Sequence, residues 1–388
     1  MNKKIMSLSC LLGITFSPSV YSDTATEIEN LKIEIEKLKV EVQKAVEWKE
    51  PSTLVHLSGY ADVGFVDAEN SNNSYNIGSF SPIFHYQYRD IVMLESELEL
   101  EVEADGSTKT SLDYLTIDLF INDYITFITG KFLSPIGQFR QNLHPSWINK
   151  LPSAPPGYGH DGAAPLSEMG VQLRGGFPIA NVRSNYALYI SNGPELITEY
   201  DGAEFELDGI AAEGKNVDID NKKVIGGRFG ILPIPSLEIA ISAATGKTTV
   251  TSIEGTGAPA LANEQARDYT VTGMDFAWQL KGFYLRGEYV HSKVAASIVG
   301  TSASDGAEWT AWYTQAAYQF YPTKIETVIR YSDFDSVGIT KDQKQWTFGV
   351  NYLFANNVIG KVAYELNDGT KSTTADDDRL LLQLAYGF

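Results

Sequence analysis

Cysteine is almost absent from this chain of 388 residues, and the single one is Cys10. From residue 11 onward, disulfide bonds, thiolate nucleophiles and cysteine-ligated metal sites are therefore excluded. Cys10 follows a leucine and a serine, as in the lipid-attachment site of a lipoprotein. Only five residues separate Lys4 from Cys10, which is too few for the apolar segment that precedes such a site, so this alternative is disfavoured.

Long apolar runs are also missing. No run of 18 apolar residues occurs, so the sequence predicts no transmembrane helix. The apolar stretch Ile5 to Phe16 is too short to span a bilayer; two lysines precede it, and small residues follow it just before Asp23. These features predict a signal peptide over residues 1–22. The exported chain is then periplasmic, secreted, or a barrel of the outer membrane.

Basic residues are scarce. Lysine and arginine together number 30 against 49 aspartates and glutamates, and the formal net charge is −19. Nucleic acid is bound through basic surfaces that neutralise its phosphates. We therefore expect no nucleic-acid partner.

Recognisable catalytic and metal-binding motifs are missing too. None of the five histidines lies in a catalytic motif, and no Gly-x-Ser-x-Gly segment occurs. A barrel lipase or protease, the rival class, would need a nucleophile, a base and an orienting acid close together. His160-Asp161 could bind a cation loosely, but no ligand spacing is diagnostic. We therefore predict no enzymatic activity, no cofactor and no metal site.

A helical periodicity is present near the N-terminus. Residues 27–46 carry apolar side chains at alternating spacings of three and four, flanked by glutamates and lysines. This is the pattern of a coiled coil. It predicts a periplasmic oligomerisation helix over residues 23–46, with a single amphipathic helix packed on its own domain as the alternative. Residues 47–53, interrupted by Pro51, are the expected linker.

Residues 54–388 have a different pattern, in which alternating segments of roughly ten residues are separated by turn-rich stretches. This pattern predicts an all-β, antiparallel transmembrane barrel. Reading Ile83 to Ala104 as one strand would give fifteen strands. Dividing it at Arg89-Asp90 gives sixteen, an even number with short turns at one end, as bacterial barrels have. The expected strands are Leu54–Val66, Asn76–Tyr88, Ile91–Ala104, Thr110–Ile121, Tyr124–Leu133, Ser167–Phe177, Val182–Ser191, Lys222–Ile231, Ser236–Gly246, Arg267–Gln279, Gly282–Lys293, Glu308–Phe320, Lys324–Asp333, Gln343–Phe354, Asn357–Asn367 and Asp378–Phe388.

The chain ends in an amphipathic segment whose last residue is Phe388. Leu380, Leu382, Leu384 and Tyr386 share its face. The segment resembles the C-terminal signal by which outer-membrane barrels are recognised for assembly, which makes the barrel-assembly machinery an expected partner. An ordinary terminal amphipathic strand is the alternative.

The stretch MLESELELEVE, from Met93 to Glu103, places a glutamate at every second position. Such a strand fits either a half-buried soluble sheet or a barrel wall between lipid and water. Carboxylates facing lipid are costly, so in a barrel they face the lumen. Sixteen segments, a signal peptide and the terminal aromatic together favour the barrel. The predicted acidic wall of the pore consists of Glu95, Glu97, Glu99, Glu101 and Glu103.

The same alternation places bases on the lumen side of other strands. An acidic wall opposite a basic one would create a transverse field that orients solutes and tunes ion choice. The alternative is local pairing, for example Arg286 with Glu288 and Arg330 with Glu326. The predicted pore bases are Arg174, Arg183, Arg228, Arg286, Arg330 and Lys361.

The segment from Ser134 to Pro165 is a long loop with six prolines. Proline stiffens a loop without regular structure, and long rigid loops are often functional. Folded inward, the loop would bring positive charge opposite the glutamates; the alternative is a lid on the rim. The candidate residues of this constriction are Lys131, Arg140, His144 and Lys150. The following loop, Asn192 to Asn221, is strongly acidic and either collects cations or is simply solvated.

Several motifs carry a family resemblance. They are GKFLSPIGQF from Gly130 to Phe139, then HPSWINKLP and SEMGVQLRGG, together with SGYADVGF and NYALYISNGP. With them the chain resembles the phosphate-selective porin O/P-like family. The N-terminal helix looks like that of related trimeric porins, including dicarboxylate-uptake porins.

The resemblance implies a homotrimeric, sixteen-stranded, water-filled channel among outer-membrane lipids, through which small hydrophilic solutes or ions diffuse passively. Phosphate selectivity in that family depends on a dense ladder of arginines and lysines, whereas the bases here are scattered. The alternatives are a phosphate- or dicarboxylate-selective porin and a plugged structural or adhesive barrel.

Overall fold

The computed structural model describes residues 32–39, 53–159, 162–200, 205–211, 214–218, 220–255, 257–302, 304–337, 342–371 and 373–388. The chain divides into two units, Met1–Ser52 and Thr53–Phe388. In the first unit, residues 32–39 form a helix with exposed side chains, and the rest of the predicted signal peptide and coiled coil lies outside the described residues. No helix in the described part of the chain is long and apolar enough to cross a membrane.

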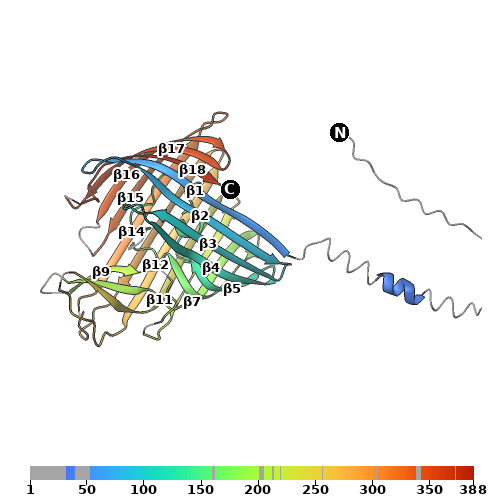
Figure 1. Cartoon of the computed structure of the whole chain (residues 1–388), viewed down its shortest axis with the longest axis horizontal. Coiled ribbons are helices and arrows are strands. Elements are labelled where there is room, and N and C mark those ends of the chain that lie inside the picture. The colour runs from blue at the N-terminus through green and yellow to red at the C-terminus, as the bar shows by residue number, and fades with distance from the viewer. Residues whose placement is uncertain are drawn as a thin grey trace, which may run out of the picture. The chain divides into compact units, whose positions relative to one another are not determined.

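Within the described residues, sixteen antiparallel strands form a closed barrel (Figure 1), in which each strand pairs with the next, β7 pairs with β10, and β18 pairs with β1. The strands of the barrel are β1 (Thr53–Ala68), β2 (Ser74–Tyr88), β3 (Val92–Val102), β4 (Thr108–Asn122), β5 (Ile125–Leu133), β6 (Ser167–Ile179), β7 (Val182–Ser191), β10 (Val224–Ile234), β11 (Leu237–Glu254), β12 (Arg267–Leu280), β13 (Phe283–Val294), β14 (Ala307–Gln319), β15 (Ile325–Asp335), β16 (Gln343–Ala355), β17 (Val358–Gly369) and β18 (Arg379–Gly387). The predicted antiparallel barrel and the division at Arg89-Asp90 are confirmed.

Two features of the long-loop end were not predicted. β8 (Glu195–Tyr200) and β9 (Phe205–Ala211) form a hairpin within the acidic loop. β8 pairs in parallel with the last part of β11, from Thr249 to Glu254, which runs beyond the expected strand end at Gly246. The extra length of β11 therefore has a partner outside the barrel wall, which periodicity along one strand does not indicate.

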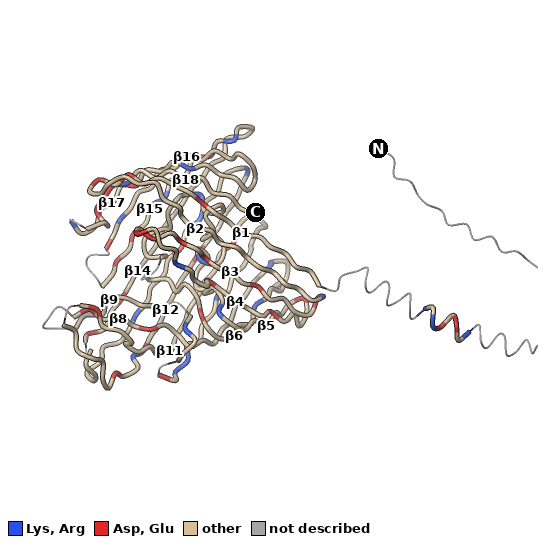
Figure 2. The backbone as a smooth tube through the Cα atoms, in the orientation of Figure 1, with Lys and Arg blue, Asp and Glu red and all other residues tan. Residues whose placement is uncertain are grey.

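The two faces of the barrel differ as the alternation predicts. On β16, Trp346, Phe348, Val350 and Tyr352 are exposed on the outside, whereas Thr347 and Asn351 between them are buried inside. Outward apolar faces suit a wall bathed in lipid. Charged residues of both signs are distributed over many strands (Figure 2).

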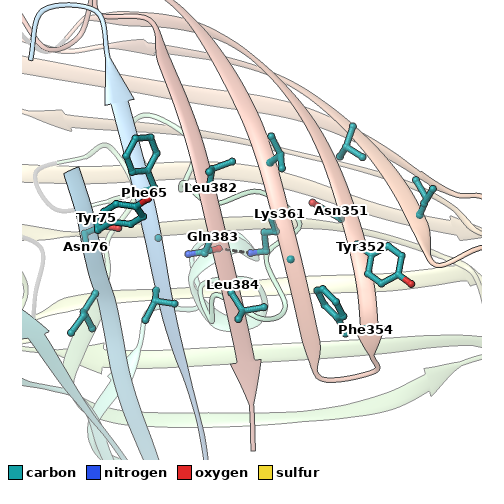
Figure 3. A pocket seen from close by; sticks show the side chains of 17 residues that line it. Phe65, Tyr75, Asn76, Asn351, Tyr352, Phe354, Lys361, Leu382, Gln383 and Leu384 are labelled. Carbon is teal, nitrogen blue, oxygen red and sulfur yellow. Dashed lines mark hydrogen bonds between the residues drawn. The ribbon is translucent and has the colours of Figure 1, made fainter. Parts of the chain in front are cut away.

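A shallow apolar groove runs across the outer face of β16, β17, β18, β1 and β2 (Figure 3). Phe65, Tyr352 and Leu382 line it. Beneath it, Lys361 Nζ donates a hydrogen bond of 2.8 Å to Gln383 Oε1. Gly360, which pairs with the outward-facing Tyr352 and Leu384, has no side chain to fill the groove.

The barrel closes at a seam between its first and last strands. The amide of Gly59 donates to the carbonyl of Phe388 at 3.0 Å, and the amide of Phe388 donates back at 2.9 Å. Nine residues of β1 pair with β18, from Tyr60 to Ala68. This seam leaves no unpaired edge at the closing strands, as a lipid-embedded sheet requires.

Candidate functional site

The inner loop is the segment from Ser134 to Pro165, and its described residues, 134–159 and 162–165, lie inside the barrel. It contains one short helix, α2 (Phe139–Asn142). Ile136, Leu151 and Tyr158 of the loop are buried, and Ile136 and Tyr158 belong to one core cluster with inner-wall residues such as Tyr313. The Tyr158 hydroxyl also donates a hydrogen bond of 3.2 Å to the Ala311 carbonyl of β14. The loop therefore occupies the lumen rather than the rim.

Glu288 of β13 anchors the first part of the inner loop. Its Oε2 accepts hydrogen bonds from the amides of Gln138, at 3.1 Å, and Phe139, at 2.9 Å. Gln138 Nε2 also donates to the carbonyl of Phe276 on β12 at 2.8 Å. One buried oxygen of Glu288 therefore satisfies two buried amides and fixes this part of the loop to β13.

Gly137 precedes this anchor, and we expect Gly137→Ala to displace the loop. Gly137 has φ +73°, and an added Cβ would lie 1.6 Å from Glu288 Oε1. Gly106→Ala is the matched control, because Gly106 has φ +84° with nothing within 4 Å of an added Cβ. Both changes introduce left-handed strain of about 1–2 kcal/mol, but Gly137→Ala alone adds the clash. Single-channel recording should show altered conductance only for Gly137→Ala; equal effects of the two changes would contradict this account.

Two bases of the C-terminal strands hold the second part of the loop. Arg330 of β15, which is 0% exposed, donates to the Ser153 carbonyl at 2.9 Å and to the Ala154 carbonyl at 3.2 Å. Lys361 of β17 donates to the carbonyls of Ser146 and Leu151. These two predicted pore bases are therefore occupied by loop backbone.

Lys150 is the loop's own cationic anchor. Its ammonium pairs with Glu326 of β15, and its carbonyl accepts from Asn351 Nδ2 at 2.9 Å. Burial lowers the pKa of Lys150, and the carboxylate of Glu326 opposes that shift. The proposed pairing of Arg330 with Glu326 is therefore replaced by Lys150 with Glu326, and Arg330 instead lies 4.0 Å from Glu365.

On the opposite side, the loop contacts the acidic wall. Arg140 lies 3.3 Å from Asp113 of β4, and His144 Nε2 lies 3.5 Å from Glu97 Oε1 of β3. The loop therefore bridges the lumen between β3–β4 and the strands of the C-terminal half.

Four of the five predicted glutamates, Glu95, Glu97, Glu99 and Glu101, belong to β3. The Tyr60 hydroxyl donates to Glu97 at 2.7 Å, and the Tyr114 hydroxyl donates to Glu95 at 3.1 Å. The fifth, Glu103, lies beyond β3 in the turn to β4 and is exposed.

The remaining predicted bases do not form one wall. Arg174 pairs with Asp118 at 3.3 Å, and Arg228 pairs with Asp275 at 2.6 Å and Glu238 at 3.0 Å. These contacts favour local pairing over a transverse field.

Three other predicted residues lie elsewhere. Arg183 is exposed at the start of β7, and Arg286 lies on β13, two residues before Glu288. Glu288 is taken by the loop amides rather than by Arg286. The assignment of Lys131 to the constriction was wrong. Lys131 pairs across the strands with outward-facing Leu115, and its ammonium donates to the Leu112 carbonyl. It therefore belongs to the outer face of β5.

Two adjoining cavities remain in the lumen beside the loop. One, of about 300 Å³, is lined by Glu95, Glu97 and Asp118 among others. The second, of about 360 Å³, is lined by Arg228 and Glu238 among others. Gln141, Asn142 and Arg174 line both. Charged side chains of both signs thus border the space that the loop leaves open.

Comparison with known proteins agrees with this architecture. Residues 220–388 match the family model of phosphate-selective porin O and P. No curated protein matches the sequence of the chain.

Solved structures share the fold at low sequence identity. The barrel is similar to an anion-selective porin from Comamonas acidovorans (TM-score 0.56, 12% identity, covering 87% of this chain and 100% of that one). It is also similar to the trimer form of OmpT, an outer membrane protein of Vibrio cholerae (TM-score 0.55, 11% identity, 87% and 99% covered). A third similar structure is OmpF of Salmonella typhi in complex with daunomycin (TM-score 0.53, 14% identity, 86% and 97% covered).

Proposed function

We propose that the chain is an outer-membrane porin that conducts small hydrophilic ions with a preference for cations. Two findings support the porin role: residues 220–388 match the family model of phosphate-selective porin O and P, and the described strands form a closed barrel. Conduction follows the cavities between the inner loop and the wall of β2 to β7 and β10. Diffusion through such a channel is passive and needs no catalytic group.

The preference for cations rests on one contrast: several basic side chains of the lumen are held by loop carbonyls or carboxylates, whereas the glutamates of β3 form a row along one wall. Arg330 and Lys361 are bound to loop carbonyls, and Arg228 is held by two carboxylates. The glutamates of β3 lie along one wall, and two of them, Glu95 and Glu97, accept hydrogen bonds from the uncharged hydroxyls of Tyr114 and Tyr60. Rings or rows of carboxylates raise the local concentration of cations.

Replacing Glu95, Glu99 and Glu101 together with glutamine should remove much of this preference. The change keeps the size of the side chains and leaves Glu97, which contacts the loop, untouched. In a planar bilayer under a KCl gradient, the zero-current potential should move toward the value of a non-selective pore. Replacing the three exposed acidic residues Glu69, Glu103 and Asp105 is the control for charge at the barrel mouth. An unchanged potential in the triple variant of β3 would exclude these glutamates as the selectivity element.

An anion channel is the second candidate, and Arg174 favours it. Arg174 lines both cavities, and its side chain is 49% exposed despite the contact with Asp118. A zero-current potential of the opposite sign, with chloride current blocked by phosphate, would establish this alternative. Correctly folded protein that conducts nothing would instead indicate a plugged structural barrel.

We also propose the assembly. The similarity to a trimeric outer membrane protein, together with the heptad pattern of residues 27–46, supports a homotrimer whose N-terminal helices associate in the periplasm. The groove over β16 to β18, β1 and β2 offers an apolar face either to lipid or to a neighbouring subunit. The final aromatic, Phe388, is the expected contact for the barrel-assembly machinery.

A further inference from the structure

Three side chains from three separate elements converge at the place where the inner loop meets the acidic wall. They are Glu97 of β3, Asp113 of β4 and His144 of the inner loop. Each offers one ligand atom, and these three atoms all lie within 4.8 Å of one another. One imidazole and two carboxylates are donors that divalent transition-metal ions accept.

A β-bulge turns Asp113 toward this point. Glu97 pairs with Tyr114 and Leu98 pairs with Leu112, so Asp113 is the extra residue on β4. Consecutive residues of a regular strand face opposite sides, yet Asp113 and Tyr114 are both buried on the lumen side. Bulges re-aim side chains in this way next to functional sites.

His144 is oriented as a metal ligand. Its Nδ1 contacts the carbonyl of Arg140, and because a carbonyl only accepts, Nδ1 carries the proton. Nε2 then presents a lone pair toward Glu97 Oε1, 3.5 Å away. The side chain is 7% exposed, and Nε2 is a buried nitrogen without a hydrogen-bond partner among the described residues. A lone pair facing a carboxylate needs a positive charge between the two.

We propose that Glu97, Asp113 and His144 bind a divalent transition-metal ion of the zinc class, which fastens the inner loop to the barrel wall. The hydrogen bond from Nδ1 to a backbone carbonyl and the one from the Tyr60 hydroxyl to Glu97 are the outer contacts that orient such ligands. The cavity of about 300 Å³, lined by Glu97 and His144, gives the ion an entrance and space for bound water.

Two positively charged groups compete with the ion. Arg140 lies 3.3 Å from Asp113 Oδ2, so the ion shares this carboxylate with the guanidinium or displaces it. The second competitor is a proton: a doubly protonated His144 would pair with Glu97 directly. Neither alternative needs all three side chains, and this difference allows the proposal to be tested.

The test is a calorimetric titration of the folded full chain in detergent with Zn²⁺. The wild type should bind one ion per chain at this site, and His144→Gln should weaken that binding by at least about tenfold. His85→Gln is the matched control, because His85 lies on the same wall, 3.3 Å from Glu95, and is not one of the three ligands. The control should bind Zn²⁺ as the wild type does.

Asp113→Asn is the second variant, which leaves the loop histidine in place. It should lose the same site, and Co²⁺ bound to the wild type should show visible absorption that this variant lacks. The proposal is overturned if the wild type binds no Zn²⁺, if His144→Gln and Asp113→Asn bind it normally, or if His85→Gln abolishes binding. The change in electrophoretic mobility on heating, which distinguishes folded from unfolded barrel, checks each variant. Calorimetry needs no ion current, so a failure of the proposed function would not be confused with a failure of this site.

Discussion

Replacing Arg330 with alanine should release the second half of the inner loop and enlarge the conducting path. Arg330 is fully buried and donates to two loop carbonyls and to Ser153 Oγ at 3.0 Å. Removing one member of a buried, hydrogen-bonded charged network costs about 3–5 kcal/mol. The barrel wall has its own backbone ladder, so the loss should fall on the seating of the loop. We expect larger single-channel conductance and more current noise.

Arg379→Ala is the control for this experiment. Arg379 contacts Glu365 at 2.6 Å, the same carboxylate that lies near Arg330, but it makes no contact with the loop among the described residues. It should leave conductance close to that of the wild type. If Arg330→Ala gave the wild-type conductance in protein that keeps its folded mobility, the loop would have to be held by other contacts.

Replacing Glu288 with alanine should free the first half of the loop. The change leaves the buried amides of Gln138 and Phe139 without their acceptor, and each unsatisfied amide costs about 1–3 kcal/mol. Conductance should rise, and sub-levels should appear as α2 moves. The result should be visible in single-channel records at constant voltage.

Two further variants separate the possible causes. Glu288→Gln keeps an oxygen that accepts the same hydrogen bonds, so it should restore most of the wild-type behaviour. Glu308→Ala removes an exposed carboxylate of β14 that pairs with Lys293 of β13, and it should have no effect. Equal disturbance in the glutamine and alanine variants at position 288 would assign the role to charge rather than to hydrogen bonding.

The strands could be predicted from the sequence because two different solvents act on them. Lipid outside and a polar lumen inside impose a strict alternation, as on β16, where Trp346 and Phe348 face outward and Thr347 faces inward. Phe388 fixes the parity of the last strand in the same way. The turn at Arg89-Asp90 could not be placed by alternation, which continues unbroken from Ile83 to Ala104, and was placed by the even strand number of bacterial barrels; in the structure Arg89 has φ 50°.

The lumen could be predicted only in part. Strand parity identifies Glu97 and Arg330 as lumen-facing residues. It does not reveal that Arg330 binds the carbonyl of Ser153, which is far away in the sequence. Asp113 was missed because a bulge changes the parity within β4. Lys131 was assigned to the constriction by its proximity to the loop in the sequence, although its position on β5 opposite Leu115 already indicates the outer face.

The inner loop also bears on the order in which the polypeptide acquires its structure. The loop leaves β5, yet most of its anchors lie on β13 to β17. Contacts between distant parts of a chain form late, because closing long stretches of chain is entropically costly. Docking of this segment must therefore follow the pairing of the C-terminal strands. A nascent barrel should pass through a stage in which its interior is still wide. In a refolding experiment, the closure of the seam between β1 and β18 should therefore be separable from the narrowing of the lumen by the loop.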